Sequence, residues 1–163
     1  MDMITVPQGV QISVEKCVVS VKGPKGEDSR DFCNSGALIE RTSDGIQVTA
    51  SKVMANTIES HIRNMITGVS EGYTFKMKML YSHFPMSLEV KPGELVIKNF
   101  IGEKQPRRVK IVGKTKIEVK GQELTVSGSN KEHIGQTVAN IKTATKIRKR
   151  DSRVFQDGIY ITE

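Results

Sequence analysis

The chain has 163 residues, with 25 Lys and Arg against 18 Asp and Glu, and a formal net charge of +7 at pH 7. Residues 1–20 lack a basic start followed by an apolar run, and no stretch has the roughly 20 apolar residues of a membrane span, so we expect neither a secreted nor a membrane-inserted protein. The two cysteines, Cys17 and Cys33, have no Cys-x-x-Cys or zinc-like spacing, which favours a reduced, cytoplasmic chain without metal or cofactor.

The first half of the chain is predicted to form short strands followed by one helix. Alternating polar and apolar residues predict strands at 11–14, 19–21, 37–39 and 46–48. Gly23-Pro24 and Gly26 predict a turn at residues 22–26. This segment is not expected to be a phosphate-binding loop, because it lacks the spacing and the Gly-Lys-Ser/Thr ending of one. From Ser51 the apolar period lengthens to three and four residues, which predicts a helix that ends before Gly72. Its apolar stripe comprises Met54, Ile58, Ile62, Met65, Ile66 and Val69. A further alternating strand is predicted at 73–81.

The second half of the chain repeats this plan. Strands are predicted at 87–90, 95–100, 109–112 and 117–126. Ser129 followed by Glu132 resembles a capping box, and the spacing of Ile134, Val138 and Ile141 predicts a second helix.

A short internal repeat indicates that one folding unit occurs twice. Residues 12–23 align without a gap on residues 117–128. The identical pairs are Ile12 and Ile117, Val14 and Val119, Val21 and Val126, and Gly23 and Gly128. We therefore predict an α+β fold of two similar lobes from an internal duplication, residues 1–82 and 83–163, each a small antiparallel sheet covered by one helix.

The charge is distributed unevenly between these two lobes. Residues 1–82 contain 9 Lys and Arg and 9 Asp and Glu, whereas residues 83–163 contain 16 and 9. A one-sided excess of this kind concentrates an anionic partner at one surface. The first lobe is therefore expected to be near-neutral, and the second is expected to be basic and suited to a polyanion, which the motifs below assign to RNA.

Two basic clusters in the second lobe suit a phosphate backbone. One spans residues 104–116 around a loop that contains Gly and Pro, and the other lies at the end of the second helix, at 142–153. Lys supplies a mobile point charge, and Arg supplies a planar fork that grips two phosphate oxygens. The alternative is a solvated basic face with incidental clustering. With five Phe, three Tyr and no Trp, shape and backbone recognition of a structured nucleic acid is favoured over stacking of single strands.

The histidines and cysteines give little support to catalysis. His61 lies on the stripe of the first helix, as a histidine of the core or of the interface between the lobes would, while His83 and His133 are expected to be structural or to face RNA. Neither cysteine has a histidine near it in sequence, so no nucleophile and base are paired locally. We expect no catalytic residue and no enzyme.

Several motifs resemble one known family. The segment 64–73 is followed by residues 76–78 and 81–85, then by Asn-Phe-Ile-Gly-Glu-Lys at 99–104 and a carboxy-terminal signature at 150–161. In this order they resemble the universal large-ribosomal-subunit protein six family in its archaeal and eukaryotic form, which eukaryotic nomenclature numbers nine. The chain departs from the family at Asp28, where a hydrophobic residue is usual, and at Thr143, where Gln is frequent.

The resemblance implies a cytoplasmic ribosomal protein that binds large-subunit ribosomal RNA near the sarcin-ricin loop and the translation-factor site. Its partners would be that RNA and neighbouring ribosomal proteins of the factor-binding region, with an indirect effect on translational GTPases and no membrane. Asp157 and Gly158 would shape the last turn and not contact phosphate. The residues expected to contact RNA are Lys104, Arg107, Arg108, Lys110, Ser127, Asn130, Lys131, Lys142, Lys146, Arg148, Lys149, Arg150, Arg153 and Tyr160.

Two alternatives remain open at this point. The first is a free-standing protein that binds structured RNA or assists ribosome assembly with the same fold. The second is a nucleotide-modifying enzyme, which would require a tight small-molecule ligand and a catalytic cluster.

Overall fold

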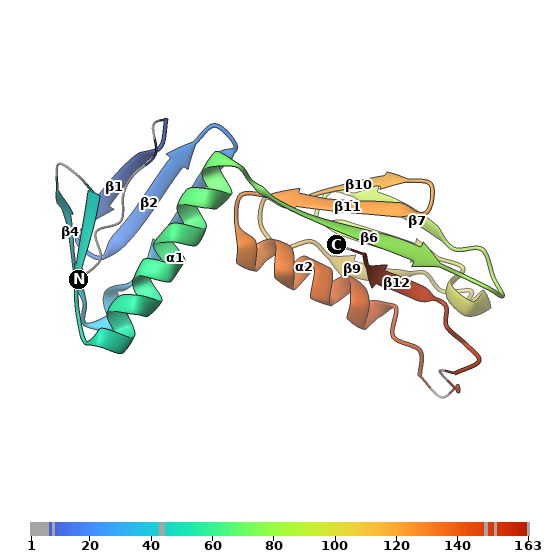
Figure 1. Ribbon diagram of the computed structural model, residues 1–163. Helices are drawn as coiled ribbons and strands as arrows, with labels where there is room; N and C mark the ends of the chain where they lie inside the picture. The colour runs from blue at the N-terminus through green and yellow to red at the C-terminus, as the bar shows by residue number, and fades with distance from the viewer. Residues whose placement is uncertain (1–6, 8, 43–44, 149, 152, 163) are drawn as a thin grey trace. The chain divides into compact units, whose positions relative to one another are not determined.

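The computed structural model describes residues 7, 9–42, 45–148, 150–151 and 153–162. The chain forms two compact units (Figure 1). Unit 1 comprises residues 1–73 and 129–131, and unit 2 comprises residues 74–128 and 132–163. No helix among the described residues is long and apolar enough to span a membrane.

Unit 1 contains two small antiparallel sheets and one long helix. A three-stranded sheet has the order β1 (Gln11–Glu15), β2 (Val18–Gly23), β3 (Gly26–Asp31). A short 3₁₀ turn, η1 (Cys33–Ser35), leads to the two-stranded sheet of β4 (Leu38–Thr42) and β5 (Gly45–Thr49). The helix α1 (Lys52–Ser70) then buries the predicted apolar stripe from Ile58 to Val69 against these strands, while Met54 at its start is only half-buried.

Unit 2 has the same class of architecture, with more strands. A three-stranded sheet has the order β7 (Ser87–Lys91), β8 (Glu94–Lys98), β9 (Arg107–Lys110), with the 3₁₀ turn η2 (Phe100–Gly102) after β8. A four-stranded sheet has the order β10 (Lys116–Lys120), β11 (Glu123–Gly128), β6 (Tyr73–Leu80), β12 (Gly158–Ile161). The helix α2 (Lys131–Ala144) lies along this sheet in Figure 1 and buries Ile134, Val138 and Ile141.

The predicted α+β class and the duplication are confirmed. The two repeated segments form hairpins of identical register: Ile12 pairs with Val21 in β1 and β2, and Ile117 pairs with Val126 in β10 and β11. Each unit nevertheless holds two sheets where one was expected.

The strand β6 belongs to unit 2, although it precedes the expected lobe boundary at residue 82. It was predicted to close the first lobe, but it pairs with β12 and is hydrogen-bonded beside β11 in unit 2. Met77 and Met79 alternate with exposed residues along this strand and are buried in that unit. The compact units therefore divide between Tyr73 and Thr74, earlier in the chain than the predicted lobes.

The turn between β2 and β3 shows why a glycine is needed at position 23. A Cβ at Gly23 would lie 2.6 Å from the carbonyl oxygen of Val69 at the end of α1. The same oxygen accepts a hydrogen bond from the Lys25 backbone N–H at 2.9 Å. The predicted turn at 22–26 is thus docked on the helix, and the polar strand β3 that follows was not predicted.

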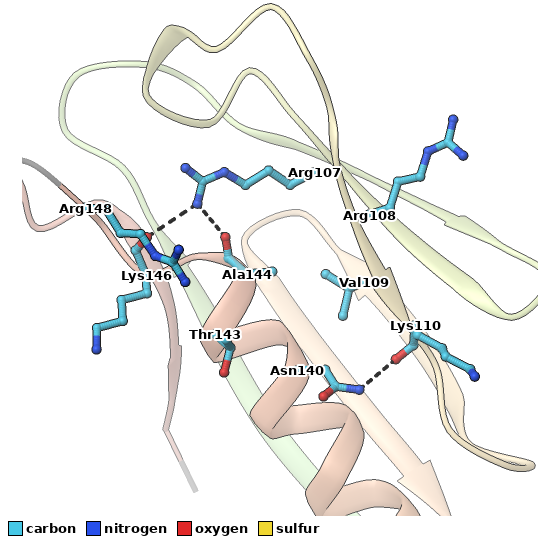
Figure 2. A pocket seen from close by; sticks show the side chains of 9 residues that line it. All are labelled: Arg107, Arg108, Val109, Lys110, Asn140, Thr143, Ala144, Lys146 and Arg148. Carbon is cyan, nitrogen blue, oxygen red and sulfur yellow. Dashed lines mark hydrogen bonds between the residues drawn. The ribbon is translucent and has the colours of Figure 1, made fainter.

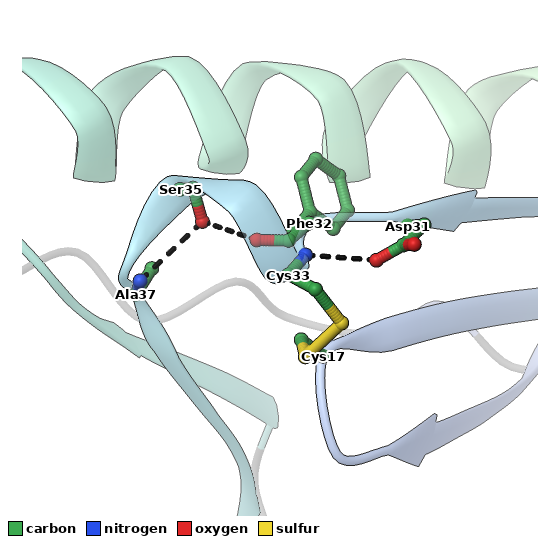
Figure 3. The surroundings of a disulfide bond; sticks show 6 residues. All are labelled: Cys17, Asp31, Phe32, Cys33, Ser35 and Ala37. Carbon is green, nitrogen blue, oxygen red and sulfur yellow. Dashed lines mark hydrogen bonds between the residues drawn. A yellow bond between two sulfur atoms is a disulfide. The ribbon is translucent and has the colours of Figure 1, made fainter.

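The expectation of reduced cysteines is wrong in this structure. Cys17 and Cys33 form a disulfide with their Cα atoms 4.9 Å apart (Figure 3). Because β2 pairs with both β1 and β3, the turn before β2 and the turn after β3 lie side by side. The backbone N–H of Phe32 donates to the carbonyl oxygen of Cys17 at 2.9 Å and holds the two turns together. This neighbourhood depends on β3.

Candidate nucleic-acid interface

The main cationic feature of unit 2 is a hollow between β9 and the end of α2, which we call the α2–β9 hollow (Figure 2). Its volume is about 560 Å³. It is lined by Arg107, Arg108, Val109, Lys110, Asn140, Thr143, Ala144, Lys146 and Arg148. Two basic segments that are far apart in the sequence therefore meet at one site.

Strand alternation and helix docking position these side chains. In β9, Val109 is buried in the core, so Arg108 and Lys110 on either side of it are exposed. The Asn140 side chain donates a hydrogen bond to the Lys110 carbonyl at 3.1 Å, and the Val112 N–H donates to the Thr137 hydroxyl at 3.1 Å. These bonds attach α2, through the buried Thr137 and the half-buried Asn140, to β9 and to the second residue after it. The end of the helix consequently brings Lys146 and Arg148 beside the strand.

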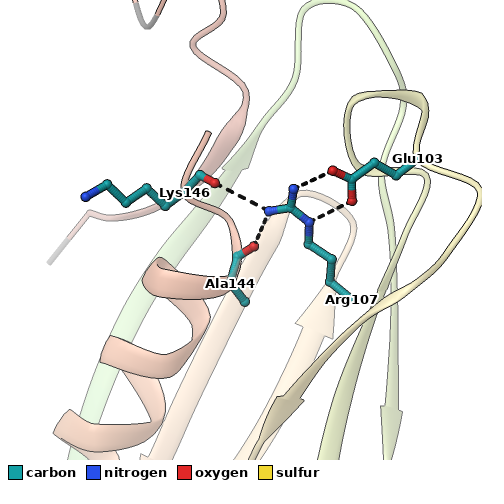
Figure 4. Close-up of polar contacts among 4 residues, drawn as sticks. All are labelled: Glu103, Arg107, Ala144 and Lys146. Atoms are coloured by element: carbon teal, nitrogen blue, oxygen red, sulfur yellow. Dashed lines mark hydrogen bonds and ion pairs between the residues drawn. The ribbon is translucent and has the colours of Figure 1, made fainter. Parts of the chain in front are cut away.

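The Arg107 side chain makes hydrogen bonds within the protein that hold the site together (Figure 4). Its guanidinium donates to both carboxylate oxygens of Glu103, and its Nη1 donates to the carbonyls of Ala144 and Lys146. The Ala144 carbonyl is at the end of α2, where helix carbonyls have no partner within the helix. The same guanidinium lies 4.3 Å from the centre of the buried Phe100 ring. Arg107 therefore caps the helix and joins it to the loop after η2.

The ion pair has an electrostatic consequence for Glu103. The hydrogen bond from Arg107 lowers the pKa of the Glu103 carboxyl below its usual value, partly opposed by desolvation. Because Glu103 neutralises Arg107, the positive charge open to a ligand comes from the other basic residues of the α2–β9 hollow.

The loop before β9 has an unusual backbone. Asn99 and Ile101 have φ values of 58° and 51°, and Gly102 follows at 74°. A β-branched residue with positive φ is strained, and such positions persist only where the surroundings hold them. Burial of Phe100 and a hydrogen bond from the Asn99 side chain to the Pro85 carbonyl at 3.0 Å hold this loop. Lys104 is exposed directly after it.

A second hollow of about 560 Å³ lies between the end of α2 and β12, and we call it the β12 hollow. Its lining includes Lys142, Lys146, Arg150, Phe155, Gly158 and Tyr160. Thr143 and Lys146 line both hollows, so the two sites are neighbours across the end of α2.

The last turn before β12 is organised by a buried carboxylate, as the sequence predicted for Asp157. This residue is 1% exposed, and its Oδ1 accepts a hydrogen bond from the Ser82 N–H at 2.6 Å. Its Oδ2 has no hydrogen-bond partner among the residues that the structure describes and lies 3.5 Å from His83 Nδ1, which makes an ion pair when the ring is protonated. Both carboxylate oxygens are therefore directed at residues 82 and 83. Asp157 shapes the turn and leaves its charge inside the protein.

Several predicted contact residues lie outside the two hollows. Ser127 is half-buried in β11 opposite Lys116, and Arg153 pairs with Asp151 at 3.1 Å. Lys149 lies outside the described residues. These positions remain predictions as RNA contacts.

Asn130 and Lys131 are engaged within unit 1. The Asn130 side chain donates to the Asp28 carboxylate at 2.9 Å, and the Lys131 ammonium lies 3.4 Å from the side-chain oxygen of Asn64. The Asp28 carboxylate thus holds the residue that follows Ser129. A Cβ at Gly68 would lie 1.9 Å from the Ser129 carbonyl oxygen, so this segment packs directly on the α1 backbone.

Sequence reasoning missed the polar residues of α2 that complete the site. Asn140 and Thr143 lie on the helix face away from its apolar stripe, and both line the α2–β9 hollow. The sequence does show that this helix has a periodic polar face. It contains no local pattern that indicates which strand this face contacts. Phe155 lies within the carboxy-terminal signature at 150–161 and is not among the predicted contact residues, yet its ring contacts both His83 and Arg150.

Only one group of possible metal ligands occurs among the described residues. It consists of Cys17, Asp31 and Cys33, whose ligand atoms lie within 4.8 Å of one another. Both sulfur atoms are joined in the disulfide, and Asp31 Oδ1 accepts a hydrogen bond from the Cys33 N–H at 2.8 Å. A thiolate is the form that binds metal, so this group does not offer its sulfur ligands in the oxidised state.

Comparison with known proteins gives a consistent result. A model of the family described as Ribosomal protein L6 matches residues 6–72 and 84–158. The large ribosomal subunit protein uL6 of Methanobrevibacter smithii is 47% identical over 164 residues, covering 97% of this chain and 92% of that protein. The proteins of the same name from Methanosarcina mazei and Archaeoglobus fulgidus are 48% and 42% identical, covering 98% and 99% of this chain and 94% and 88% of their own lengths. The motif resemblance and the full-length matches agree, and the chain belongs to the ribosomal protein L6 family.

Proposed function

We propose that the chain is a structural constituent of the large ribosomal subunit and that unit 2 binds ribosomal RNA there. The observation that carries this proposal is the α2–β9 hollow, which is lined by exposed basic residues from β9 and from the segment beyond α2. The names of the full-length relatives support the assignment to the large subunit. The family is one of ribosomal proteins and not of enzymes.

The charge of the two units fits this proposal. Unit 1 contains 8 Lys and Arg and 9 Asp and Glu, whereas unit 2 contains 17 and 9. A polyanion is therefore attracted to unit 2. Each phosphate that a Lys or Arg neutralises releases condensed counterions, which is the main source of salt-dependent affinity.

The mechanism is positional. Arg107 fixes the loop at 99–104 to the end of α2, so that Arg108, Lys110 and Arg148 are held at set spacings. A rigid array of cations neutralises phosphates where RNA segments approach one another, and this stabilises one arrangement of the RNA.

The finer placement rests on the family resemblance. The bound RNA would be the region of the sarcin-ricin loop, beside the translation-factor site, with neighbouring ribosomal proteins as further partners. Any effect on translational GTPases would be indirect, through the position of that RNA.

Sedimentation distinguishes the ribosomal role from that of a free-standing RNA-binding or assembly protein. A tagged chain expressed in its host should migrate with large subunits through a high-salt wash. The matched variant Arg108→Ala/Lys110→Ala/Arg148→Ala should fold but be lost from subunits in that wash. Recovery of the wild-type chain only at the top of the gradient would contradict the proposal, and recovery only with precursor particles would favour the assembly protein.

A further inference from the structure

The β12 hollow differs from the α2–β9 hollow because it has an exposed aromatic wall. Tyr160 is 45% exposed on β12, which is the edge strand of the four-stranded sheet. The neighbouring strand places Lys78 directly opposite it. An exposed ring beside cationic side chains is the combination that binds an unstacked base and its phosphate.

Two contacts hold the Tyr160 ring in place, one at its hydroxyl and one between the ring and Gly158. Its hydroxyl donates to the Gln156 carbonyl at 3.2 Å. The ring lies over Gly158, where a Cβ would be 3.2 to 3.3 Å from three of the ring and hydroxyl atoms. The absence of a side chain at position 158 therefore lets the ring lie flat along the strand. A ring that is already fixed loses little conformational freedom when a base stacks on it.

The other aromatic residue of the hollow lining, Phe155, is covered by contacts within the protein. The Phe155 ring lies 4.8 Å from the His83 ring, and the Arg150 guanidinium lies 4.8 Å from its centre. Phe155 thus supports Arg150 at the rim. Tyr160 remains the aromatic surface for a ligand.

The rim of the hollow supplies positive charge. Lys142, Lys146 and Arg150 are exposed and come from the last turn of α2 and the segment after it. Among the described residues of the lining, the carboxylate is that of Asp157, which is 1% exposed and bonded to the Ser82 N–H, so it lies inside the protein and not on the exposed rim. The volume of about 560 Å³ falls within the range of roughly 300–1,000 Å³ typical of small-ligand sites.

We infer that the β12 hollow binds a single unpaired nucleotide of the RNA, with its base stacked on Tyr160 and its phosphate at the basic rim. This inference rests on the proposed function. Because Thr143 and Lys146 line both hollows, a strand whose phosphates lie in the α2–β9 hollow can place its next nucleotide in the β12 hollow. A paired base inside a duplex does not expose its face, so the site selects a bulged or looped nucleotide.

The test compares two RNA hairpins that differ only by one bulged nucleotide, bound to the full chain. The wild-type chain should bind the bulged hairpin more tightly by about 5- to 100-fold, as expected for one base stacked on an aromatic side chain. Tyr160→Phe keeps the ring and should keep the preference, whereas Tyr160→Leu should abolish the difference in affinity between the two hairpins. Tyr81→Leu is the matched control, because Tyr81 is 38% exposed and lies outside the hollow lining.

A second measurement does not depend on a folded variant. A 5-iodouridine at the bulge should cross-link to Tyr160 of the wild-type chain on irradiation. A cross-link to another surface, equal affinity for the two hairpins, or binding of neither hairpin would overturn the inference. Competition by a free nucleoside monophosphate with no effect of the bulge would also overturn it and indicate a free nucleotide as ligand. Large-subunit RNA bound without a bulge preference would leave the proposed function intact, whereas no binding of that RNA would remove both.

Discussion

We expect Arg107 to stabilise the RNA site without itself neutralising an RNA phosphate, so replacing it should affect stability more than the salt dependence of binding. Its guanidinium bonds Glu103, caps the Ala144 and Lys146 carbonyls, and lies over Phe100. Its side chain is 27% exposed, so solvent screens these interactions only in part. Hydrogen bonds of a charged group contribute about 1.5–3 kcal/mol, a cation–π contact about 0.5–1 kcal/mol and an exposed ion pair at most about 1 kcal/mol.

These contributions share one side chain and do not add fully, so Arg107→Ala should lower the free energy of unfolding of unit 2 by about 2–4 kcal/mol. Arg107→Lys should lose most of the same stability, because an ammonium cannot reproduce the fork that meets both the carboxylate and the carbonyls. Chemical denaturation followed by circular dichroism measures both variants. Arg108→Ala is the control, since Arg108 is exposed and should change stability by no more than about 0.5 kcal/mol.

In the RNA-binding assay the order of the two arginines is reversed: Arg108→Ala should change the salt dependence of affinity more than Arg107→Ala does. Arg108→Ala should reduce the slope of log K against log[salt] by about 0.7 to 0.9, the value for one lost phosphate contact. Arg107→Ala should weaken binding through disorder of the site, with a smaller change in slope at temperatures where it stays folded. An unchanged stability for Arg107→Ala, together with a full one-contact loss of slope, would refute the structural role.

Three further predictions concern both units. Gly68→Ala should destabilise unit 1 by more than about 3 kcal/mol in denaturation experiments, because its Cβ would overlap the Ser129 carbonyl; a normal unfolding curve would contradict the packing of residues 129–131. Reducing the disulfide between Cys17 and Cys33, which are 16 residues apart, should cost about 3 kcal/mol by loop entropy, and equal melting of the oxidised and reduced chains would contradict it. Because Arg107 lowers the pKa of Glu103, the stabilisation is present above the usual carboxyl pKa and is lost as pH falls through the lowered one. The stability advantage of wild type over Glu103→Gln should therefore be complete at neutral pH and vanish in acid; an advantage independent of pH would contradict the ion pair.

The sequence predicted the features that depend on local periodicity. The repeated segments form the hairpins β1–β2 and β10–β11 in matching register, and both helices bury the stripes that spacing indicated, except for Met54 at the start of α1. Hydrophobic alternation carries this information because the side-chain period of a strand or helix is set by its backbone geometry. The basic clusters were also visible, since charge is read directly from composition.

The remaining features depend on which distant segments become neighbours. The strand β3 is polar and exposed, so only its pairing with β2 defines it, and the disulfide neighbourhood depends on that pairing. The pairing of β6 with β12 joins segments that no local pattern links. Arg107 looked like the other basic residues of its cluster because its carboxylate and carbonyl partners are positioned only after α2 docks on β9.

The most direct measurement is the salt dependence of affinity for large-subunit ribosomal RNA after neutralising each unit. Arg108→Ala/Lys110→Ala/Arg148→Ala in unit 2 should reduce the magnitude of the log K against log[salt] slope by roughly 2 to 3, for about three lost phosphate contacts. Lys22→Ala/Lys25→Ala/Lys52→Ala in unit 1 removes the same number of charges and should leave the slope almost unchanged. Equal losses from the two triple variants, or a larger loss from unit 1, would contradict RNA binding through unit 2.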